Sequence, residues 1–402
     1  MELRSLSRPP VAGTGALAFS GSLWRGAALT SAALTSATLA SAALTDPARL
    51  DPASPYGPLG PPDAGGVALP EGFTARVVAR SRRTVTGTAF TWHDAPDGGA
   101  CFPDGTGWIY VSNAEVGAGG GGASALRFGP AGNITSAYTI LAGTSRNCGG
   151  GATPWSTWLS CEETAAGHVW ETSPWGGPAV RRPAMGRFDH GAAAADPVRE
   201  VVYLTEDEPD GGFYRFVPDA WGDLSSGTLQ VLAAGAATSG PFTWEAVPDP
   251  GGSPRAVREQ VPGMKAFDGG EGCHCADDAV WFTTKGDGRV WRVDLLGGAY
   301  ALASGSGLTV PGRGPLARAD GITGSSSGDL YVAEDGGAME IRVVTPDGGD
   351  SVFLRVSGQS ASELCGPAFN PAGDRMYFSS RRGTSGSPSG GITYEVRGPF
   401  RT

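Results

Sequence analysis

Six residues with metal-ligating side chains precede six aromatic residues at nearly constant spacing. Each stands 10 to 14 positions before a tyrosine, tryptophan or phenylalanine that lies within a short apolar run. Carboxylate oxygens are the donors that Ca²⁺ prefers, whereas a thiolate favours a transition metal, so the set predicts a mixed metal site. The candidates and their aromatic partners are Asp97 and Tyr110, Cys148 and Trp158, His190 and Tyr203, Glu271 and Phe282, Asp320 and Tyr331, and Glu363 and Tyr377.

A second set of carboxylates stands at or just beyond the ends of these apolar runs. If each run is a strand antiparallel to one that begins at the ligand-type residue, its end returns to the same level. So many carboxylates in one place would repel one another unless cations neutralised them. These further candidates are Glu115, Glu162, Glu163, Glu206, Asp207, Glu334 and Asp335.

The apolar runs repeat along the chain. Between successive aromatic markers the intervals are 48, 45, 79, 49 and 46 residues. Repeats of about 40–50 residues with several short strands are typical of propeller blades, which bury their faces only by stacking around a ring. The sequence therefore predicts an all-β, six-bladed β-propeller with one long insertion around residues 215–265. The runs are Trp108–Asn113, Thr157–Glu163, Val201–Asp207, Val280–Lys285, Leu330–Asp335 and Met376–Ser380.

The two ends of the chain indicate how the ring closes. Ile392–Val396 ends the last repeat one strand short, and the Phe73–Val78 run has no hairpin partner. We therefore expect the N-terminal strand to complete the last blade, with residues 56–402 as one propeller domain. Residues 1–55 are expected to be an export signal and a Pro-rich linker, which predicts a periplasmic or extracellular protein. The apolar stretch of the signal is too polar for a stable membrane span.

Charge and cysteine spacing narrow the function classes. The formal net charge of −10 excludes nucleic acid as a partner, because phosphates require a basic face. The six cysteines show no pairing that spacing alone can reveal. The Cys273–Cys275 run is not a zinc site, because strand neighbours point to opposite faces and no second ligand pair follows. The glycine run at 149–151 does not join a strand to a helix, which argues against a nucleotide loop.

One stretch carries a family resemblance. Residues 147–163 read NCGGGATPWSTWLSCEE and resemble a long motif of the PhoX family of bacterial alkaline phosphatases. Shorter similar motifs extend the resemblance over about residues 55–400, essentially the whole chain after the export segment. They lie at residues 186–188, 203–207, 269–272, 282–287, 333–337 and 362–364.

The resemblance implies an exported phosphatase that hydrolyses small phosphomonoesters at a Ca²⁺ and Fe³⁺ cluster in the propeller mouth. Such metals offset charge in the transition state and present an oxo or hydroxo nucleophile, so no side-chain nucleophile is implied. In that picture Cys148 holds iron. The other implied metal ligands are Glu162, Glu271, Asp320 and Glu363, with Glu163, Glu334 and Asp335 nearby. Asp97, Glu115, His190, Glu206 and Asp207 are candidates for the surrounding shell by position.

The sequence also departs from the family pattern. Where relatives have His-Glu this chain has His190-Gly191, and where they have Asp-Asn it has Asp320-Gly321. Gly191 removes a carboxylate that would bridge metals, which lowers the expected affinity for iron. The alternative hypothesis is therefore a catalytically silent propeller, stabilised by calcium, that acts as an extracellular binding module. Under either hypothesis we expect a monomer.

Overall fold

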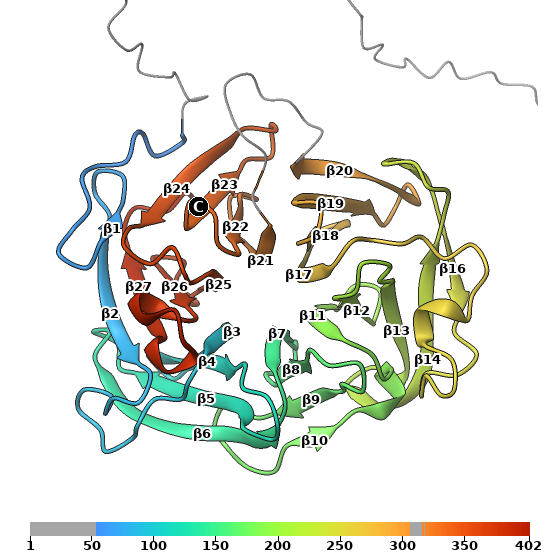
Figure 1. The fold of residues 1–402 in the computed structure, drawn as a ribbon, viewed down its shortest axis with the longest axis horizontal. Helices are drawn as coiled ribbons and strands as arrows, with labels where there is room; N and C mark the ends of the chain where they lie inside the picture. The colour runs from blue at the N-terminus through green and yellow to red at the C-terminus, as the bar shows by residue number, and fades with distance from the viewer. Residues whose placement is uncertain (1–53, 306–315, 317) are drawn as a thin grey trace, which may run out of the picture. The chain divides into compact units, whose positions relative to one another are not determined.

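Six antiparallel sheets surround a central channel (Figure 1). The structure is a computed structural model that describes residues 54–305, 316 and 318–402. The export signal and the first part of the linker lie outside these residues. The all-β, six-bladed propeller expected from the repeats is confirmed, and every marker run forms the second strand of its blade.

The first three blades follow one another along the chain. From the channel outward, the first contains β3 (Pro96–Asp104), β4 (Gly107–Ala114), β5 (Gly121–Phe128) and β6 (Ile134–Thr144). The second contains β7 (Asn147–Ala152), β8 (Trp158–Glu162), β9 (Val169–Thr172) and β10 (Val180–Arg181). The third contains β11 (His190–Asp196), β12 (Val201–Glu206), β13 (Phe213–Ala220), β14 (Asp223–Ala233) and β16 (Thr243–Ala246).

The other three blades each recruit a strand from elsewhere in the chain. The fourth contains β17 (Gly270–Ala276), β18 (Ala279–Thr284), β19 (Arg289–Asp294), β20 (Ala299–Gly305) and β15 (Gly240–Pro241). The fifth contains β21 (Ala319–Gly324), β22 (Leu330–Glu334), β23 (Glu340–Val344), β24 (Asp350–Val356) and β1 (Val67–Ala68). The sixth contains β25 (Leu364–Phe369), β26 (Arg375–Ser380), β27 (Ile392–Arg397) and β2 (Thr74–Arg80).

The ring closes through the N-terminal strand, as the sequence predicts. β2 pairs antiparallel with β27, with Ala75 opposite Val396 and Val77 opposite Tyr394. Because the two strands lie at opposite ends of the described chain, their pairing joins the sixth blade to the start of the propeller. The edge of β27 is thereby covered rather than exposed.

The predicted insertion extends the third blade and reaches the fourth. β14 and β16 pair at the outer edge of the third blade, with Leu232 opposite Trp244. The short β15 just before β16 pairs instead with β20, with Gly240 opposite Tyr300. The insertion therefore joins two neighbouring blades. Four short 3-10 helices complete the fold: η1 (Pro183–Met185), η2 (Val257–Glu259), η3 (Gly383–Ser385) and η4 (Pro388–Gly390).

The aromatic markers form the core between blades. Tyr110 of the first blade stacks on Tyr377 of the sixth at 4.7 Å between ring centroids, and both are fully buried. Phe282 of the fourth blade stacks on Phe213 of the third at 4.2 Å. Each aromatic side chain buries about 150–250 Å², which corresponds to roughly 4–6 kcal/mol of hydrophobic stabilisation per ring before the loss of side-chain conformational entropy is subtracted. These contacts hold neighbouring blades together.

Two further findings bear on the sequence analysis. No helix in the described part of the chain is long and apolar enough to cross a membrane. The six cysteines, all within the described ranges, are free thiols.

Candidate metal centre

One backbone hydrogen bond recurs at the same mouth of the channel in all six blades. The residue directly after each second strand donates its N–H to the carbonyl oxygen of the residue directly before the inner strand, at 2.8–3.2 Å. We call the six donor residues the rim positions. Four are acids and two are cations. The donor and acceptor pairs are Glu115 and Ala95, Glu163 and Arg146, Asp207 and Asp189, Lys285 and Gly269, Asp335 and Arg318, and Arg381 and Glu363.

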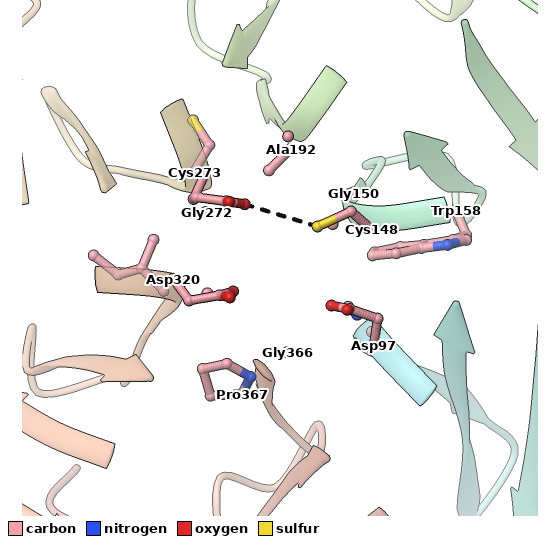
Figure 2. Close-up of a pocket in the computed structure, with 17 residues that line it drawn as sticks. Asp97, Cys148, Gly150, Trp158, Ala192, Gly272, Cys273, Asp320, Gly366 and Pro367 are labelled. Atoms are coloured by element: carbon pink, nitrogen blue, oxygen red, sulfur yellow. Dashed lines mark hydrogen bonds between the residues drawn. The ribbon is translucent and has the colours of Figure 1, made fainter. Parts of the chain in front are cut away.

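A second ring lies just inside the channel. Each inner strand has a register shift near its start, which turns one residue per blade toward the axis. Together these residues line a cavity of about 50 Å³. Figure 2 shows Asp97, Cys148 and Asp320 pointing into it. We call the set the channel positions: Asp97, Cys148, Gly191, Glu271, Asp320 and Gly366.

Glycines allow the inner strands to approach one another so closely. One glycine in each inner strand lies against the backbone of the next blade, where an added Cβ would sit only 2.2–2.9 Å from a backbone atom. Such contacts leave no room for a side chain. The run Gly149–Gly151 therefore serves packing, in keeping with the absence of a nucleotide loop. The six glycines are Gly98, Gly149, Gly191, Gly272, Gly321 and Gly366.

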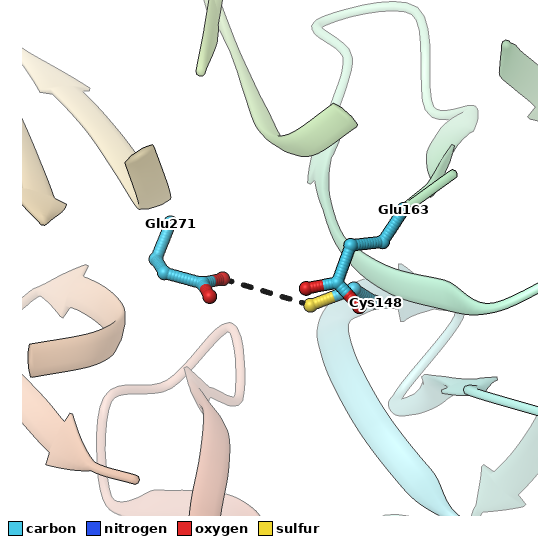
Figure 3. Close-up of side chains that lie close together, drawn as sticks. All are labelled: Cys148, Glu163 and Glu271. Atoms are coloured by element: carbon cyan, nitrogen blue, oxygen red, sulfur yellow. Dashed lines mark hydrogen bonds between the residues drawn. The ribbon is translucent and has the colours of Figure 1, made fainter. Parts of the chain in front are cut away.

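The first group of possible ligands lies between the second and fourth blades (Figure 3). It consists of Cys148, Glu163 and Glu271, all buried, each with one ligand atom within 4.8 Å of the others. The thiol of Cys148 faces Glu271 Oε2 at 3.7 Å. We call these three residues the thiol group. Lys285 contacts Glu271 and lies 3.6 Å from Glu163 Oε1.

The second group lies between the sixth and first blades. It consists of Asp97, Glu115 and Glu363, again buried and with ligand atoms within 4.8 Å of one another. We call these three the carboxylate group. Arg381 contacts Glu115 and Glu363, and its Nη1 lies 3.8 Å from Asp97 Oδ2.

Burial and mutual repulsion disfavour ionisation of these acids in the metal-free protein. Burial raises the pKa of Glu271 to about 7 and that of Glu363 to about 9. It likewise raises the pKa of Asp97 and Asp320, and it raises the pKa of the Cys148 thiol well above its usual range. At an effective dielectric constant of about 20, two like charges 4.8 Å apart repel by about 3 kcal/mol.

Bound cations would reverse this balance. The buried carboxylate oxygens form a donor set that suits Ca²⁺, and the single thiol among them suits a transition metal. The residues present therefore fit metal ions of the kinds that the sequence predicts.

Comparison with known proteins agrees with this geometry. The family model "Alkaline phosphatase PhoX" matches residues 107–178 and 172–291, which contain the whole thiol group. The chain is PhoX-like. The family resemblance predicted from the motifs is thus confirmed, whereas a search of curated proteins finds no match.

Solved structures show the same fold. Pseudomonas fluorescens PhoX in complex with vanadate, a transition state analogue, superimposes with a TM-score of 0.68 at 16% identity, covering 83% of this chain and 96% of that one. A gluconolactonase from Xanthomonas campestris gives a TM-score of 0.51 at 14% identity, covering 86% and 99%. At these identities the similarity concerns the fold alone.

Two of the predicted residues, Glu162 and Glu206, lie outside both groups and hydrogen-bond elsewhere. Glu162 accepts backbone N–H bonds from Ser145 at 3.0 Å and His168 at 3.1 Å. Glu206 accepts bonds from Gly212 N–H and Tyr214 O–H at 2.8 and 2.6 Å. Both carboxylates are therefore held by groups close to them in the chain. The residues that follow them, Glu163 and Asp207, occupy the rim positions and face the mouth. Neighbouring residues on a strand point to opposite faces, which explains the difference of one residue.

His190 also points away from the channel axis. Its ring packs on Phe188, with 3.7 Å between centroids, and Nε2 lies 3.2 Å from Gly186 O. Burial lowers the pKa of His190 to about 3, so the ring is neutral. The channel position of this blade belongs to the next residue, Gly191, which offers no ligand atom.

The remaining candidates lie at the mouth. Asp320 occupies a channel position. Burial makes the largest contribution to its raised pKa, and the negative charges of Glu271 and Asp97 raise it further. Asp207 and Asp335 occupy rim positions, where Asp207 pairs with Lys285 at 2.9 Å and Asp335 pairs with Arg318 at 2.8 Å. Glu334 is buried at the end of β22, opposite Ala319.

Sequence reasoning missed the basic residues of the mouth. Lys285 and Arg381 contact the thiol group and the carboxylate group, respectively. Arg146 lies 3.5 Å from both Glu115 and Glu163, and Arg382 binds Glu363 at 3.0 Å. A signal was available, because Lys285 and Arg381 follow their strands at the position that holds an acid in the other four blades.

Proposed function

We propose that the protein is a metal-dependent phosphatase that hydrolyses small phosphomonoesters at this mouth of the channel. The observation that carries the proposal is the convergence of Cys148, Glu163 and Glu271 in a chain that matches the alkaline phosphatase PhoX family model. Vanadate, the ligand of the similar Pseudomonas structure, is a transition state analogue, which supports phosphoryl chemistry.

We propose Ca²⁺ at the carboxylate oxygens and iron at Cys148. Bound metal would supply Lewis acidity and offset the negative charge that a phosphoryl group carries into its transition state. On the protein side, Cys148, Glu163 and Glu271 would hold one site and Asp97, Glu115 and Glu363 a second. Asp320 lies at a neighbouring channel position and would contribute a further oxygen donor.

The geometry indicates where the substrate would bind. The cavity between the channel positions measures about 50 Å³, enough for ions or a few waters but too small for an organic phosphate. The phosphate would therefore bind above it, at the level of the rim positions, with the organic group toward solvent. Lys285 and Arg381 lie at that level and carry the positive charge that an anionic substrate requires.

The alternative is a calcium-stabilised binding module without catalysis. Gly191 favours it, because this blade gives the channel no ligand atom. The structure also shows that a side chain cannot be added there without a backbone shift, since a Cβ would lie 2.2 Å from Gly270 O. Restoring a glutamate at this position is therefore not a clean test of the missing ligand.

Two expectations about the setting of the protein belong to the same proposal. The export signal expected from residues 1–55 would deliver the chain to the periplasm or outside the cell. We also propose that it acts as a monomer, because the six blades close into one ring that contains both groups of possible ligands.

The test combines elemental analysis by plasma mass spectrometry with hydrolysis of p-nitrophenyl phosphate by the same purified sample. We expect iron and calcium together with turnover. Cys148→Ser should lose iron, and Glu271→Gln should lower turnover by about 100-fold or more. Calcium without iron or turnover would support the binding module instead. Turnover in protein stripped of all metal would overturn the metal-dependent mechanism.

A further inference from the structure

Two basic side chains contact the two groups of possible metal ligands. Lys285 and Arg381 are rim residues, and the equivalent residues of the other four blades are acids. Each contacts one group: Lys285 contacts Glu271 of the thiol group, and Arg381 contacts Glu115 and Glu363 of the carboxylate group. Each of the two groups of possible ligands is thus in contact with one of the two basic rim residues.

The surroundings of Lys285 are acidic. Its Nζ contacts Glu271 and lies 2.9 Å from Asp207 Oδ2 and 3.6 Å from Glu163 Oε1. These carboxylates come from the second, third and fourth blades, so one ammonium group bridges three blades. It is one of only two lysines in a chain that otherwise uses arginine.

Arg381 has an equivalent position at the other site. Its guanidinium bridges Glu115 of the first blade and Glu363 of the sixth, and it approaches Asp97 to 3.8 Å. Both cations are only partly buried, with 20% of the Lys285 side chain and 22% of the Arg381 side chain exposed. Both side chains are therefore already in contact with solvent.

A metal ion bound by either group would compete with these side chains for the negative charge of the same carboxylates. Glu163 and Glu271 are two of the three possible ligands of the thiol group, and Lys285 lies against both. A cation bound by the group would repel the ammonium at short distance and would compete for the same oxygen lone pairs. The same argument applies to Arg381 at Glu115 and Glu363.

We propose that Lys285 and Arg381 are internal counter-ions that metal ions must displace, and that the displaced side chains then bind the anionic group of the ligand. In the metal-free protein they neutralise the acidic mouth and keep the blades together. In the metal-loaded protein they turn toward the open mouth, where ammonium and guanidinium groups bind phosphate oxygens. The second step rests on the proposed phosphatase function, whereas the first does not.

The first step is tested by calorimetric titration of the metal-free, full-length protein with Ca²⁺ alone. Removal of a competing cation should tighten Ca²⁺ binding, so Lys285→Met and Arg381→Met should each lower the apparent dissociation constant by about tenfold. The matched control is Arg127→Met, which removes one positive charge from an exposed ion pair with Asp104 at the other end of β3. Equal affinity in wild type and both variants would overturn the proposal.

A second measurement covers variants that are poorly folded without metal. In the presence of a chelator, the Lys285→Met variant should have a lower melting temperature than wild type, because Glu163, Asp207 and Glu271 lose their counter-ion. In saturating Ca²⁺ the two melting temperatures should converge. A deficit that persists unchanged in Ca²⁺ would show an ordinary structural ion pair and would overturn the counter-ion role.

The second step is tested with inorganic phosphate as the probe. With Ca²⁺ saturating, Lys285→Met and Arg381→Met should bind phosphate about tenfold more weakly than wild type, while Arg127→Met should not. Unchanged phosphate affinity would refute the second step alone. If the wild-type protein does not hydrolyse p-nitrophenyl phosphate, the proposed phosphatase function is contradicted. The Ca²⁺ titration does not depend on that activity, so failure of the phosphatase function and failure of the counter-ion role can be distinguished.

Discussion

Single residues at the mouth decide what the channel can bind. Gly191 is the clearest case, because its blade offers the channel neither a carboxylate nor space for one. We predict that Gly191→Ala destabilises the fold by about 1–3 kcal/mol in urea unfolding, since its Cβ would meet Gly270 O at 2.2 Å. Gly235→Ala is the matched control, because nothing lies within 4 Å there. Equal stability of the two variants would contradict the close contact.

The buried ring of His190 should make the free energy of unfolding depend on pH. Burial lowers its pKa from 6.5 to about 3, so the unfolded chain binds a proton in this window that the folded protein does not. Stability contributed by the neutral ring is therefore present above pH 6.5 and is lost as pH falls from 6.5 toward 3. At pH 5 the loss amounts to about 2 kcal/mol.

His190→Gln removes this titration. We expect the free energy of unfolding of the variant to fall less than that of wild type between pH 7 and pH 5, as measured by urea unfolding. Ca²⁺ affinity should stay unchanged, because the ring faces Phe188 and Gly186 rather than the channel. A loss of Ca²⁺ binding would instead place His190 at the metal centre.

At the scale of elements, the pairing of β2 with β27 is the contact that makes the ring continuous. A chain that begins at residue 81 lacks β2 and exposes the edge of β27. We therefore expect it to unfold at a lower urea concentration and to bind Ca²⁺ with lower affinity. A chain that begins at residue 71 keeps β2 and loses only β1, which isolates the effect. Equal midpoints for the two chains would show that the ring does not depend on this strand.

The inner strands explain why the two groups of possible metal ligands lie at the same mouth. Each begins at the acidic mouth and has its register shift there, so the residues near its start turn toward the axis. Farther along, the residues of these strands that line the channel are mostly small or apolar. The loss of the ring closure would widen the spacing between Asp97 and Glu363, which come from the first and sixth blades.

At the scale of the whole molecule, the two parts of the channel differ in charge, because among the described residues acids line only the part at the mouth with the rim positions. Beyond the channel positions the channel opens into a cavity of about 310 Å³, lined by small and apolar residues together with Cys101, His274 and Cys275. Burial lowers the pKa of His274 to about 4, so this lining is neutral at pH 7. The acids that line the channel therefore lie at one end of it, at the mouth that carries the rim positions.

The sequence alone determined the number of blades, the closing strand and the level of the site. Repeat spacing depends on local strand and turn patterns, which short stretches of chain encode. The same spacing predicted Asp97, Cys148, Glu271, Asp320 and Glu363 as possible metal ligands, and the structure places all five at the mouth. The PhoX-like motif suggested the phosphatase chemistry that we propose.

Tertiary structure decided which of two adjacent residues faces the channel and which cations neutralise it. Glu163 rather than Glu162, and Gly191 rather than His190, face the axis, because a shift of one residue turns a strand side chain to the opposite face. Arg381 joins the sixth blade to Glu115 of the first, which closure of the ring brings together, and Lys285 joins acids of three consecutive blades.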